Sequence, residues 1–248
     1  MSPREILSCA ALVALSWVSP AWAAGQPLEF AVKKPHLIGA SHGTLVFSDQ
    51  GVEYKTTDGK DARRWSYEQI KQIQVLSPTR VAIRTYEDQG WSKGWADRDF
   101  RFEVTQDRVT PDLVAFLLAK NPRAIVTAVL PPTSEQPLYR IPVKHVRVRH
   151  GSNGDLLLFR DRLVYEADRL DASRSWRFGD IASVLALDRY RLEVTTYEGG
   201  AGDTRPFLFQ LKTDLPPGFF DALWAAVNTP APLRSGNQPS QRRHPESE

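Results

Sequence analysis

An internal repeat is the feature that most constrains what this chain of 248 residues can fold into. Residues 41–87 align on residues 152–198 without a gap, at an offset of 154 − 43 = 111. After a loop that is shorter in the second copy, the alignment continues at an offset of 207 − 100 = 107. The identical pairs of the first stretch are Ser41/Ser152, Gly43/Gly154, Leu45/Leu156, Tyr54/Tyr165, Arg63/Arg174, Trp65/Trp176, Ile70/Ile181, Leu76/Leu187, Arg80/Arg191, Thr85/Thr196, Tyr86/Tyr197 and Glu87/Glu198. So regular a match predicts two copies of one fold.

Both copies show the pattern of short β-strands. Apolar residues fall at every second position, and a strand turns alternate side chains to one face of its sheet. Turn-forming residues separate the runs, for example at 48–51 and 57–60. The expected strands contain Leu45, Phe47, Val52, Tyr54, Trp65, Tyr67, Ile73, Val75, Val81, Ile83, Phe100, Phe102 and Val104, with equivalent residues in the second copy. Each copy is therefore predicted to form an antiparallel meander with one buried face.

One helix is expected after each meander. In the first copy Thr110 suits the N-cap, Pro111 suits the first helical position, and Asn121 stops the helix. In the second copy Pro216 and Pro217 are expected to begin the helix. The apolar residues expected to face the sheet are Leu113, Phe116 and Leu117 in the first helix and Phe219, Phe220, Leu223, Trp224 and Val227 in the second. A helix that is apolar on one side must cover something, and the open end of the curved sheet is the natural partner.

These features together carry a family resemblance. Both copies begin with a Gly-x-Leu start, at 43–45 and 154–156, and continue with a Trp-x-aromatic-x-x-Ile stretch, at 65–70 and 176–181. Each copy resembles the pleckstrin-homology-like (PH-like) superfamily, and most of all its bacterial and GRAM-like branch. The resemblance implies a mainly β fold of two tandem PH-like units. Each unit would be an antiparallel β-sandwich or partly open barrel of six or seven strands, capped by one C-terminal α-helix. The resemblance implies a binding scaffold and does not identify the ligand.

The N-terminus has the three parts of a secretory signal peptide. A short n-region with one Arg precedes an apolar run at 6–18, and Ala21-Trp22-Ala23 suits cleavage after Ala23. The apolar run is shorter than the roughly 20 residues that span a bilayer, and we expect no transmembrane segment after the signal is removed. Cys9 is the only cysteine and lies in the removed part, so the mature chain is expected to lack disulfides. The sequence predicts an exported protein, periplasmic or secreted.

The repeat boundaries and the signal peptide divide the chain into five parts. We expect a signal peptide at 1–23, a first PH-like domain at 34–121, a Pro-containing linker at 122–142, a second PH-like domain at 143–229 and a disordered tail at 230–248. The linker prolines favour an extended spacer. Whether the two domains act as separate modules or pack into one pseudo-symmetric body is left open by the sequence.

Motifs for catalysis or cofactor binding are not found in the sequence, and we predict no catalytic residue, no cofactor and no metal. The histidine pairs His36/His42 and His145/His150 lead into the two copies, but no adjacent carboxylate pattern completes a metal site. Glu87 and Glu198 recur after Thr-Tyr, for which a structural role at a strand end is favoured. The alternative is an envelope-acting hydrolase, with these glutamates and the lead-in histidines in a cleft between the two repeats.

One loop breaks the symmetry between the copies. Residues 88–99 of the first copy include Trp91, Lys93, Trp95 and Arg98, whereas the second copy has the shorter, Trp-free segment 199–205. Indole rings suit half-wet surfaces, so this loop is a candidate for contacts with a sugar, a peptide or a lipid interface. The alternative is that the loop folds back to pack against its own sheet or the other copy.

Arg160 and Arg162 come nearest to a basic first hairpin and complete the set of candidate binding residues. The net charge of +3 is too small and too evenly spread for nucleic-acid binding. We therefore expect a non-catalytic exported binding module that recognises a protein, an envelope lipid or a glycan through its loops. A purely structural envelope component differs from this only in having a permanent partner.

Overall fold

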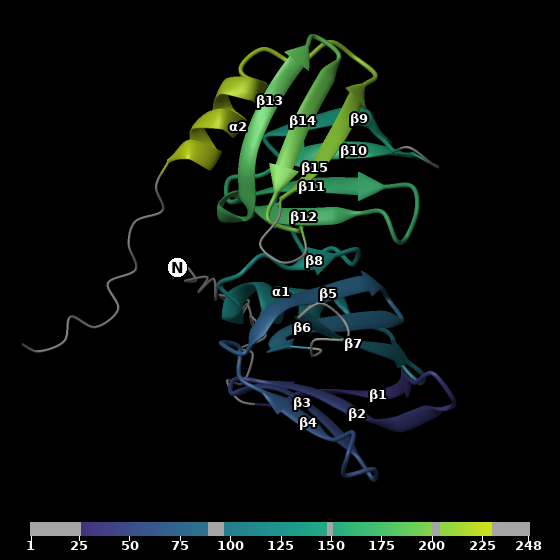
Figure 1. Ribbon diagram of the computed structural model, residues 1–248. Helices are drawn as coiled ribbons and strands as arrows, with labels where there is room; N and C mark the ends of the chain where they lie inside the picture. The colour runs from purple at the N-terminus through teal and green to yellow at the C-terminus, as the bar shows by residue number, and fades with distance from the viewer. Residues whose placement is uncertain (1–25, 89–96, 148–150, 200–203, 230–248) are drawn as a thin grey trace, which may run out of the picture.

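The computed structural model describes residues 26–88, 97–147, 151–199 and 204–229. These residues form two β-sheets, one in each repeat, and two α-helices (Figure 1). All strand pairings but one are antiparallel. The prediction of a mainly β chain, with two similar units that each end in a helix, is confirmed.

The first repeat contributes an eight-stranded sheet with the order β4-β3-β2-β1-β7-β6-β5-β8. Its first seven strands follow the predicted meander, which β1 closes by pairing with β7. The eighth strand comes from the segment after the helix and was not predicted. The strands are β1 (Leu28–Pro35), β2 (Ala40–Ser48), β3 (Gly51–Thr56), β4 (Arg63–Trp65), β5 (Ile70–Ser77), β6 (Arg80–Asp88), β7 (Asp97–Val104) and β8 (Val126–Thr127).

The second repeat contributes a seven-stranded sheet with the order β12-β11-β10-β9-β15-β14-β13. This order matches the first sheet strand for strand, with β9 to β15 in the places of β1 to β7. Within the described ranges, β8 has no counterpart in the second sheet. The strands are β9 (Tyr139–Val146), β10 (Ser152–Leu158), β11 (Arg162–Ala167), β12 (Arg174–Arg177), β13 (Ile181–Asp188), β14 (Arg191–Thr196) and β15 (Arg205–Leu211), with a short 3-10 helix at Phe178–Asp180.

Each sheet curls over, so that β1 to β4 face β5 to β7 across a core in the first repeat and β9 to β12 face β13 to β15 in the second (Figure 1). The alternating apolar residues of the sequence fill that core, because every second side chain of each strand points inward. Aromatic rings meet between the two layers at equivalent positions of the two repeats. The ring pairs are Tyr54–Phe102 at 5.0 Å and Trp65–Phe100 at 4.7 Å, then Tyr165–Phe209 at 5.1 Å and Trp176–Phe207 at 4.9 Å between centroids.

The helices are α1 (Pro111–Lys120) and α2 (Phe219–Asn228), and neither has the length and apolarity that crossing a bilayer takes. Helix α1 begins as predicted, with the Thr110 side chain accepting a hydrogen bond from the Leu113 N–H. Helix α2 begins after Gly218 and not at the two prolines.

The prediction that Trp224 faces the sheet is wrong, since its side chain is 53% exposed. Phe219 and Leu223 are the fully buried residues of α2. They lie four residues apart, so they occupy one stripe of the helix, and Trp224 lies about 100° further round the axis.

The segment that joins the repeats packs on both of them. Its first part forms β8, which pairs parallel to β5. Further along, Leu130 packs against Leu157, Phe159 and Val164 on the outer face of the second sheet. The linker segment is therefore held against both sheets.

Arg177 of β12 provides a direct contact between the two repeats. Its guanidinium donates hydrogen bonds of 2.9 Å to the carbonyls of Leu118, Asn121 and Arg123. These carbonyls lie at the C-terminal end of α1, where backbone acceptors lack helical partners and the helix dipole favours a cation. Asp180 accepts two hydrogen bonds of 2.9 Å from the same guanidinium and fixes its orientation.

Candidate functional site

The predicted recognition loop lies largely outside the described residues. This holds for Trp91, Lys93 and Trp95. Arg98 is described, at the start of β7, and pairs with Glu87 at 3.4 Å. Its guanidinium also lies 5.9 Å from the centre of the Phe100 ring. Arg98 thus has its acidic partner within its own repeat.

The two arginines predicted near the first hairpin of the second repeat differ in their surroundings. Arg160 is exposed. Arg162 pairs with Asp161 at 2.6 Å and Glu135 at 3.8 Å, and its guanidinium lies 4.3 Å from the Phe159 ring centre. Arg162 therefore fastens the linker to the second repeat and already has acidic partners.

The repeated Trp and Glu residues form the same bond in both units. The indole N–H of Trp65 donates to Glu87 at 3.0 Å, and that of Trp176 donates to Glu198. Both tryptophans are buried in the core, as predicted. In the second repeat, Arg174 also donates to Glu198 at 3.2 Å. The glutamates thus fix the ends of their strands.

A polar cluster in the first repeat lies where β1 ends. The Lys34 ammonium and the His36 ring contact the Asp61 carboxylate at 2.5 and 2.6 Å, and the Ser41 hydroxyl donates to it at 2.6 Å. Burial raises the pKa of Asp61, but the hydrogen bonds from Lys34 and Ser41 and the charges of Lys34 and His36 lower it to about 2. Lys34, the lysine of this cluster, therefore has an acidic partner.

Serine, histidine and aspartate meet in this cluster, but not in the order of a catalytic triad. The same nitrogen, Nε2 of His36, lies 3.1 Å from Ser41 Oγ and 2.6 Å from Asp61 Oδ2. In a triad one ring nitrogen faces the serine and the other faces the aspartate. The cluster is therefore an ion-pair network.

The second repeat carries different charges at the same place. The repeat alignment gives the equivalent pairs Lys34/His145, His36/Arg147, Asp61/Ala172, Arg63/Arg174, Glu87/Glu198 and Arg98/Arg205. His145, Arg147, Arg174 and Arg205 are called the arginine cluster below. Ala172 replaces the carboxylate that neutralises the first repeat. Glu198 is then the carboxylate that remains at an equivalent position.

Two arginines of this cluster, Arg147 and Arg205, make no close ion pair within the described residues, although the charges of Asp171 and Glu198 act on them. Arg174 is paired with Glu198 at 3.2 Å. Arg147 donates instead to the His145 ring nitrogen Nδ1 at 3.3 Å, and Arg205 lies over the Phe207 ring at 5.1 Å. The arginine cluster therefore holds positive charge in excess of its carboxylates.

The titration behaviour of the arginine cluster follows from this excess. Burial, and then the charges of Arg147, Arg174 and Arg205, lower the pKa of His145 to about 4. Burial and the charges of Arg174 and Arg205 lower the pKa of Arg147, and the charge of Asp171 opposes this shift. Burial and the charge of Arg174 lower the pKa of Arg205, and the charge of Glu198 opposes this shift. His145 is thus neutral at pH 7, as it must be to accept a hydrogen bond on Nδ1.

Sequence reasoning missed this cluster because its members come from the ends of three strands far apart in the chain. A search for basic residues within one hairpin finds Arg160 and Arg162 instead. The signal was present in the repeat alignment, where Ala172 stands opposite Asp61. Reading the repeats for lost carboxylates, and not only for gained cations, would have found the site.

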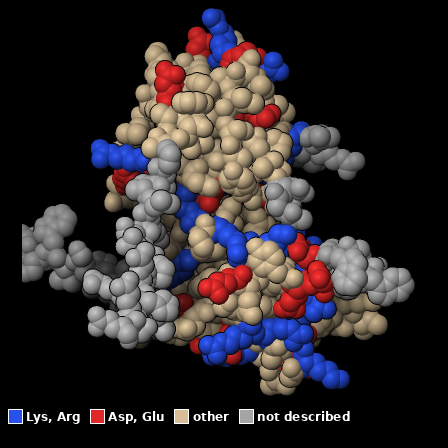
Figure 2. All heavy atoms as spheres, turned by 60° about the vertical axis from the view of Figure 1, so that its left-hand side comes forward, with Lys and Arg blue, Asp and Glu red and all other residues tan. Residues whose placement is uncertain are grey.

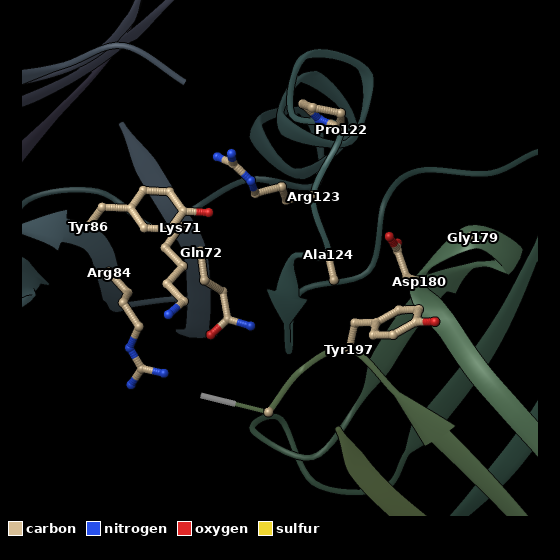
Figure 3. Close-up of a pocket in the computed structure, with 11 residues that line it drawn as sticks. Lys71, Gln72, Arg84, Tyr86, Pro122, Arg123, Ala124, Gly179, Asp180 and Tyr197 are labelled. Carbon is tan, nitrogen blue, oxygen red and sulfur yellow. The ribbon is translucent and has the colours of Figure 1, made fainter. Parts of the chain in front are cut away.

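A second candidate site is a cavity of about 340 Å³ between the two repeats (Figure 3). Tyr86 and Tyr197, the tyrosines of the repeated Thr-Tyr-Glu motif, both line it and are half exposed. Lys71 and Arg84 line it as well. Figure 2 shows Lys and Arg side chains, with acidic ones among them, at this junction.

Two of the three cations that line the cavity, Lys71 and Arg84, form ion pairs. Lys71 pairs with Asp97 at 2.6 Å, and Arg84 pairs with Asp99 at 2.7 Å. Arg123 directs one guanidinium nitrogen to backbone carbonyls, including that of Ile70 at 2.6 Å. Within the described residues the cavity therefore offers aromatic faces and one cation without a close carboxylate, Arg123, whereas the arginine cluster has two.

The side chains that the hydrolase alternative needs do not line this cavity. Glu87, Glu198, His36 and His145 each make their described contacts within their own repeat. In the part of the chain that the structure describes, no three His, Cys, Asp or Glu side chains are grouped to hold a metal ion.

No protein-family model matches the chain, and no curated protein matches its sequence. Among solved structures, the C-terminal domain of an unknown protein from Leishmania infantum is 18% identical, with a TM-score of 0.30. That match covers 38% of this chain and 84% of the other. The Spt16D Pob3N heterodimer is 12% identical with a TM-score of 0.30, over 69% of this chain and 83% of the other. Neither similarity identifies a ligand.

Proposed function

We propose that the protein is a non-catalytic binding module, exported to the periplasm or secreted, whose second repeat binds an anionic group through the arginine cluster. The signal-peptide pattern of residues 1–23 supports export. The observation that carries the binding site is the charge imbalance. Arg147 and Arg205 make no close ion pair in the described part of the chain, while Lys34 and Arg98 of the first repeat each do.

The chemistry of the cluster suits a phosphate or carboxylate. A guanidinium offers two parallel N–H donors to such a group, and charge-assisted bonds of this kind are stronger than neutral ones. Because His145 accepts from Arg147 on Nδ1, its ring is neutral, so it adds no positive charge and helps to orient the Arg147 guanidinium. Partial burial strengthens each of these interactions relative to bulk water. An envelope lipid, a glycan or an acidic protein segment supplies such an anionic group.

The test uses the repeats as controls for one another. The mature chain, beginning at Ala24, is titrated with inorganic phosphate and with acetate while its backbone amides are followed by NMR. We expect phosphate to shift amides near Arg147 and Arg205 and to leave those near Lys34 and Arg98 in place. Vesicles with and without phosphatidylglycerol then separate a lipid headgroup from a free anion.

Two reciprocal variants sharpen the experiment. Ala172→Asp restores the carboxylate of the first repeat, and we expect phosphate to bind at least tenfold more weakly. Asp61→Ala removes that carboxylate from the first repeat, and we expect new phosphate shifts there. Arg205→Ala weakens binding, whereas its equivalent Arg98→Ala does not. Unchanged phosphate affinity in both Ala172→Asp and Arg205→Ala would contradict the proposal.

A further inference from the structure

The two sheets end differently at one edge, and the first repeat shows what the second lacks. In the first sheet β5 is followed by β8, so β5 is not the last strand. In the second sheet β13, the counterpart of β5, is the last described strand. This surface is separate from the arginine cluster, and the inference does not rest on the proposed anion site.

Strand β8 seals the edge of the first sheet through both backbone and side chains. Val126 and Thr127 pair in parallel with Gln74 and Val75. The next N–H, that of Ala128, donates to the Val75 carbonyl at 2.8 Å. Just before the strand, Ile125 is buried and belongs to the core of the first repeat. A short apolar segment therefore completes both the hydrogen bonding and the core at this edge.

The equivalent residues of the second repeat are exposed. Leu185, Ala186 and Leu187 of β13 stand where Gln74, Val75 and Leu76 stand in β5. Leu185 and Leu187 are 50% and 47% exposed. Ala186 is exposed too, although its equivalent Val75 is fully buried. An exposed apolar strand at a sheet edge presents unpaired N–H and C=O groups, which are a template for another strand.

Helix α2 lies beside β13 and borders the same region of the surface (Figure 1). This helix carries the half-exposed Trp224. In the first repeat, the residues that precede and form β8 cover the corresponding region and are themselves buried. At this edge the second repeat has helix α2 in contact with β13, whereas the first repeat has β8 paired with β5.

We propose that the edge of β13 binds an extended, apolar segment of a partner polypeptide, which adds to the second sheet as a parallel strand in the place that β8 occupies in the first. Main-chain hydrogen bonds supply affinity in such strand addition, and pockets for side chains supply specificity. The bond from Ala128 to Val75 predicts one from the incoming strand to the carbonyl of Ala186. An apolar side chain at the position of Ile125 fills the open end of the core.

The partner is expected to be another polypeptide and not the chain's own C-terminal segment. Counted from Asn121 and Asn228, Pro232, Leu233 and Arg234 stand where Ile125, Val126 and Thr127 stand. Thr127 is fully buried in the first repeat, and an arginine in its place would bury a charge, which is costly unless the charge is paired. The segment after the second helix therefore lacks a sequence like the one that forms β8.

The first repeat provides the probe for the test. A synthetic peptide with the sequence of residues 123–129, Arg-Ala-Ile-Val-Thr-Ala-Val, is titrated into the full mature chain while the amides of 184–188 are followed by NMR. The control peptide carries Asp at the position of Ile125. We expect the first peptide to shift these amides saturably and the control peptide to bind at least tenfold more weakly.

Two variants of β13 make the result specific. N–H and C=O of one strand residue point to the same side, so Ala186→Pro removes an N–H from the free edge, where proline is tolerated. Leu185→Lys combined with Leu187→Lys leaves the backbone intact and protects the edge with charge. We expect each variant to weaken peptide binding at least tenfold. Ala172→Asp, which disables the proposed anion site, leaves peptide affinity unchanged.

Four outcomes would overturn this proposal. One is equal affinity of wild type and both β13 variants, and another is peptide shifts confined to 74–76, where the peptide would have displaced β8. A third is a gain of peptide affinity when the chain ends at Thr229, which would make the chain's own segment the occupant. The fourth is a concentration-dependent dimer whose interface includes β13 and excludes the peptide.

Discussion

The same Trp–Glu hydrogen bond occurs in both repeats, but its surroundings differ in burial and charge. Both place a core indole N–H on a glutamate at a strand end. The carboxylate of Glu87 is 41% exposed and its ion-pair partner Arg98 lies at the surface, whereas Glu198 is 1% exposed beside the buried Arg174. Duplication has thus retained the contact that fixes the strand, while the charges around it have diverged. The same substitution should therefore have different effects in the two repeats.

The largest difference is expected for the two glutamates. Glu198→Ala leaves the Arg174 guanidinium buried without its partner and the Trp176 N–H unbonded, at a cost of about 3–5 kcal/mol in the free energy of unfolding. Glu87→Ala costs about 1 kcal/mol, because water replaces the lost partner of an exposed group. Urea unfolding of both variants measures the two costs. Equal losses would show that burial of the second pair does not determine its importance.

A second comparison uses pH, because His145 stands where the first repeat has Lys34. The folded-state pKa of about 4 lies below the ordinary 6.5, so the unfolded chain binds more protons between these values. His145 therefore contributes stability that is present above pH 6.5 and lost as pH falls towards 4. The full contribution is about 3 kcal/mol at most. We expect the unfolding free energy of His145→Gln to depend less on pH between 4 and 6.5.

Asp61 provides the matched control in a different pH window. Its folded-state pKa of about 2 lies below the ordinary 3.8, so its stabilising contribution is lost as pH falls from 3.8 towards 2. Asp61→Asn should flatten the pH dependence of stability only in that lower window. If both variants changed the same window, the separate assignment of the two groups would be wrong.

The alternation of apolar residues predicted most of the fold, because strand period and core burial are local consequences of sequence. The repeat alignment extended that prediction to the equivalence of the two units. Strand β8 was missed because it has only two residues, which are too few to show an alternation of apolar and polar side chains, and it lies in a linker with several prolines. The arginine cluster was missed because strand pairing, and not chain proximity, brings Arg147, Arg174 and Arg205 to one place. The exposure of Trp224 could not be predicted, because α2 has two neighbouring apolar stripes and the sequence does not show which of them faces the core.

The junction between the repeats is expected to show the next largest effect. Arg177→Ala removes the donor from three carbonyls at the end of α1 and leaves the buried Asp180 without its cation. We expect a loss of about 2–3 kcal/mol, since hydrogen bonds of charged groups are worth more than neutral ones. Ser66, the equivalent residue of the first repeat, makes no such contact in the described structure, so Ser66→Ala should change stability by less than about 0.5 kcal/mol. Unfolding of the repeats in two steps in Arg177→Ala, and one step in the wild type, would identify this contact as the source of their coupling.

The smallest effects on stability are expected at the N-termini of α1 and α2, the helices that end the two repeats. Thr110 caps α1 through its side chain, and Thr110→Ala should cost about 1 kcal/mol in the free energy of unfolding.

Gly218 precedes α2 with φ of 77°, in the left-handed region, and makes no side-chain cap. Serine is among the best capping residues elsewhere, yet we expect Gly218→Ser to destabilise by about 1 kcal/mol, because a side chain is strained at this φ. A Cβ at this position would also lie 3.2 Å from the Tyr139 hydroxyl. Thermal unfolding of both variants checks the pair, and a stabilised Gly218→Ser protein would mean that α2 begins in the same way as α1.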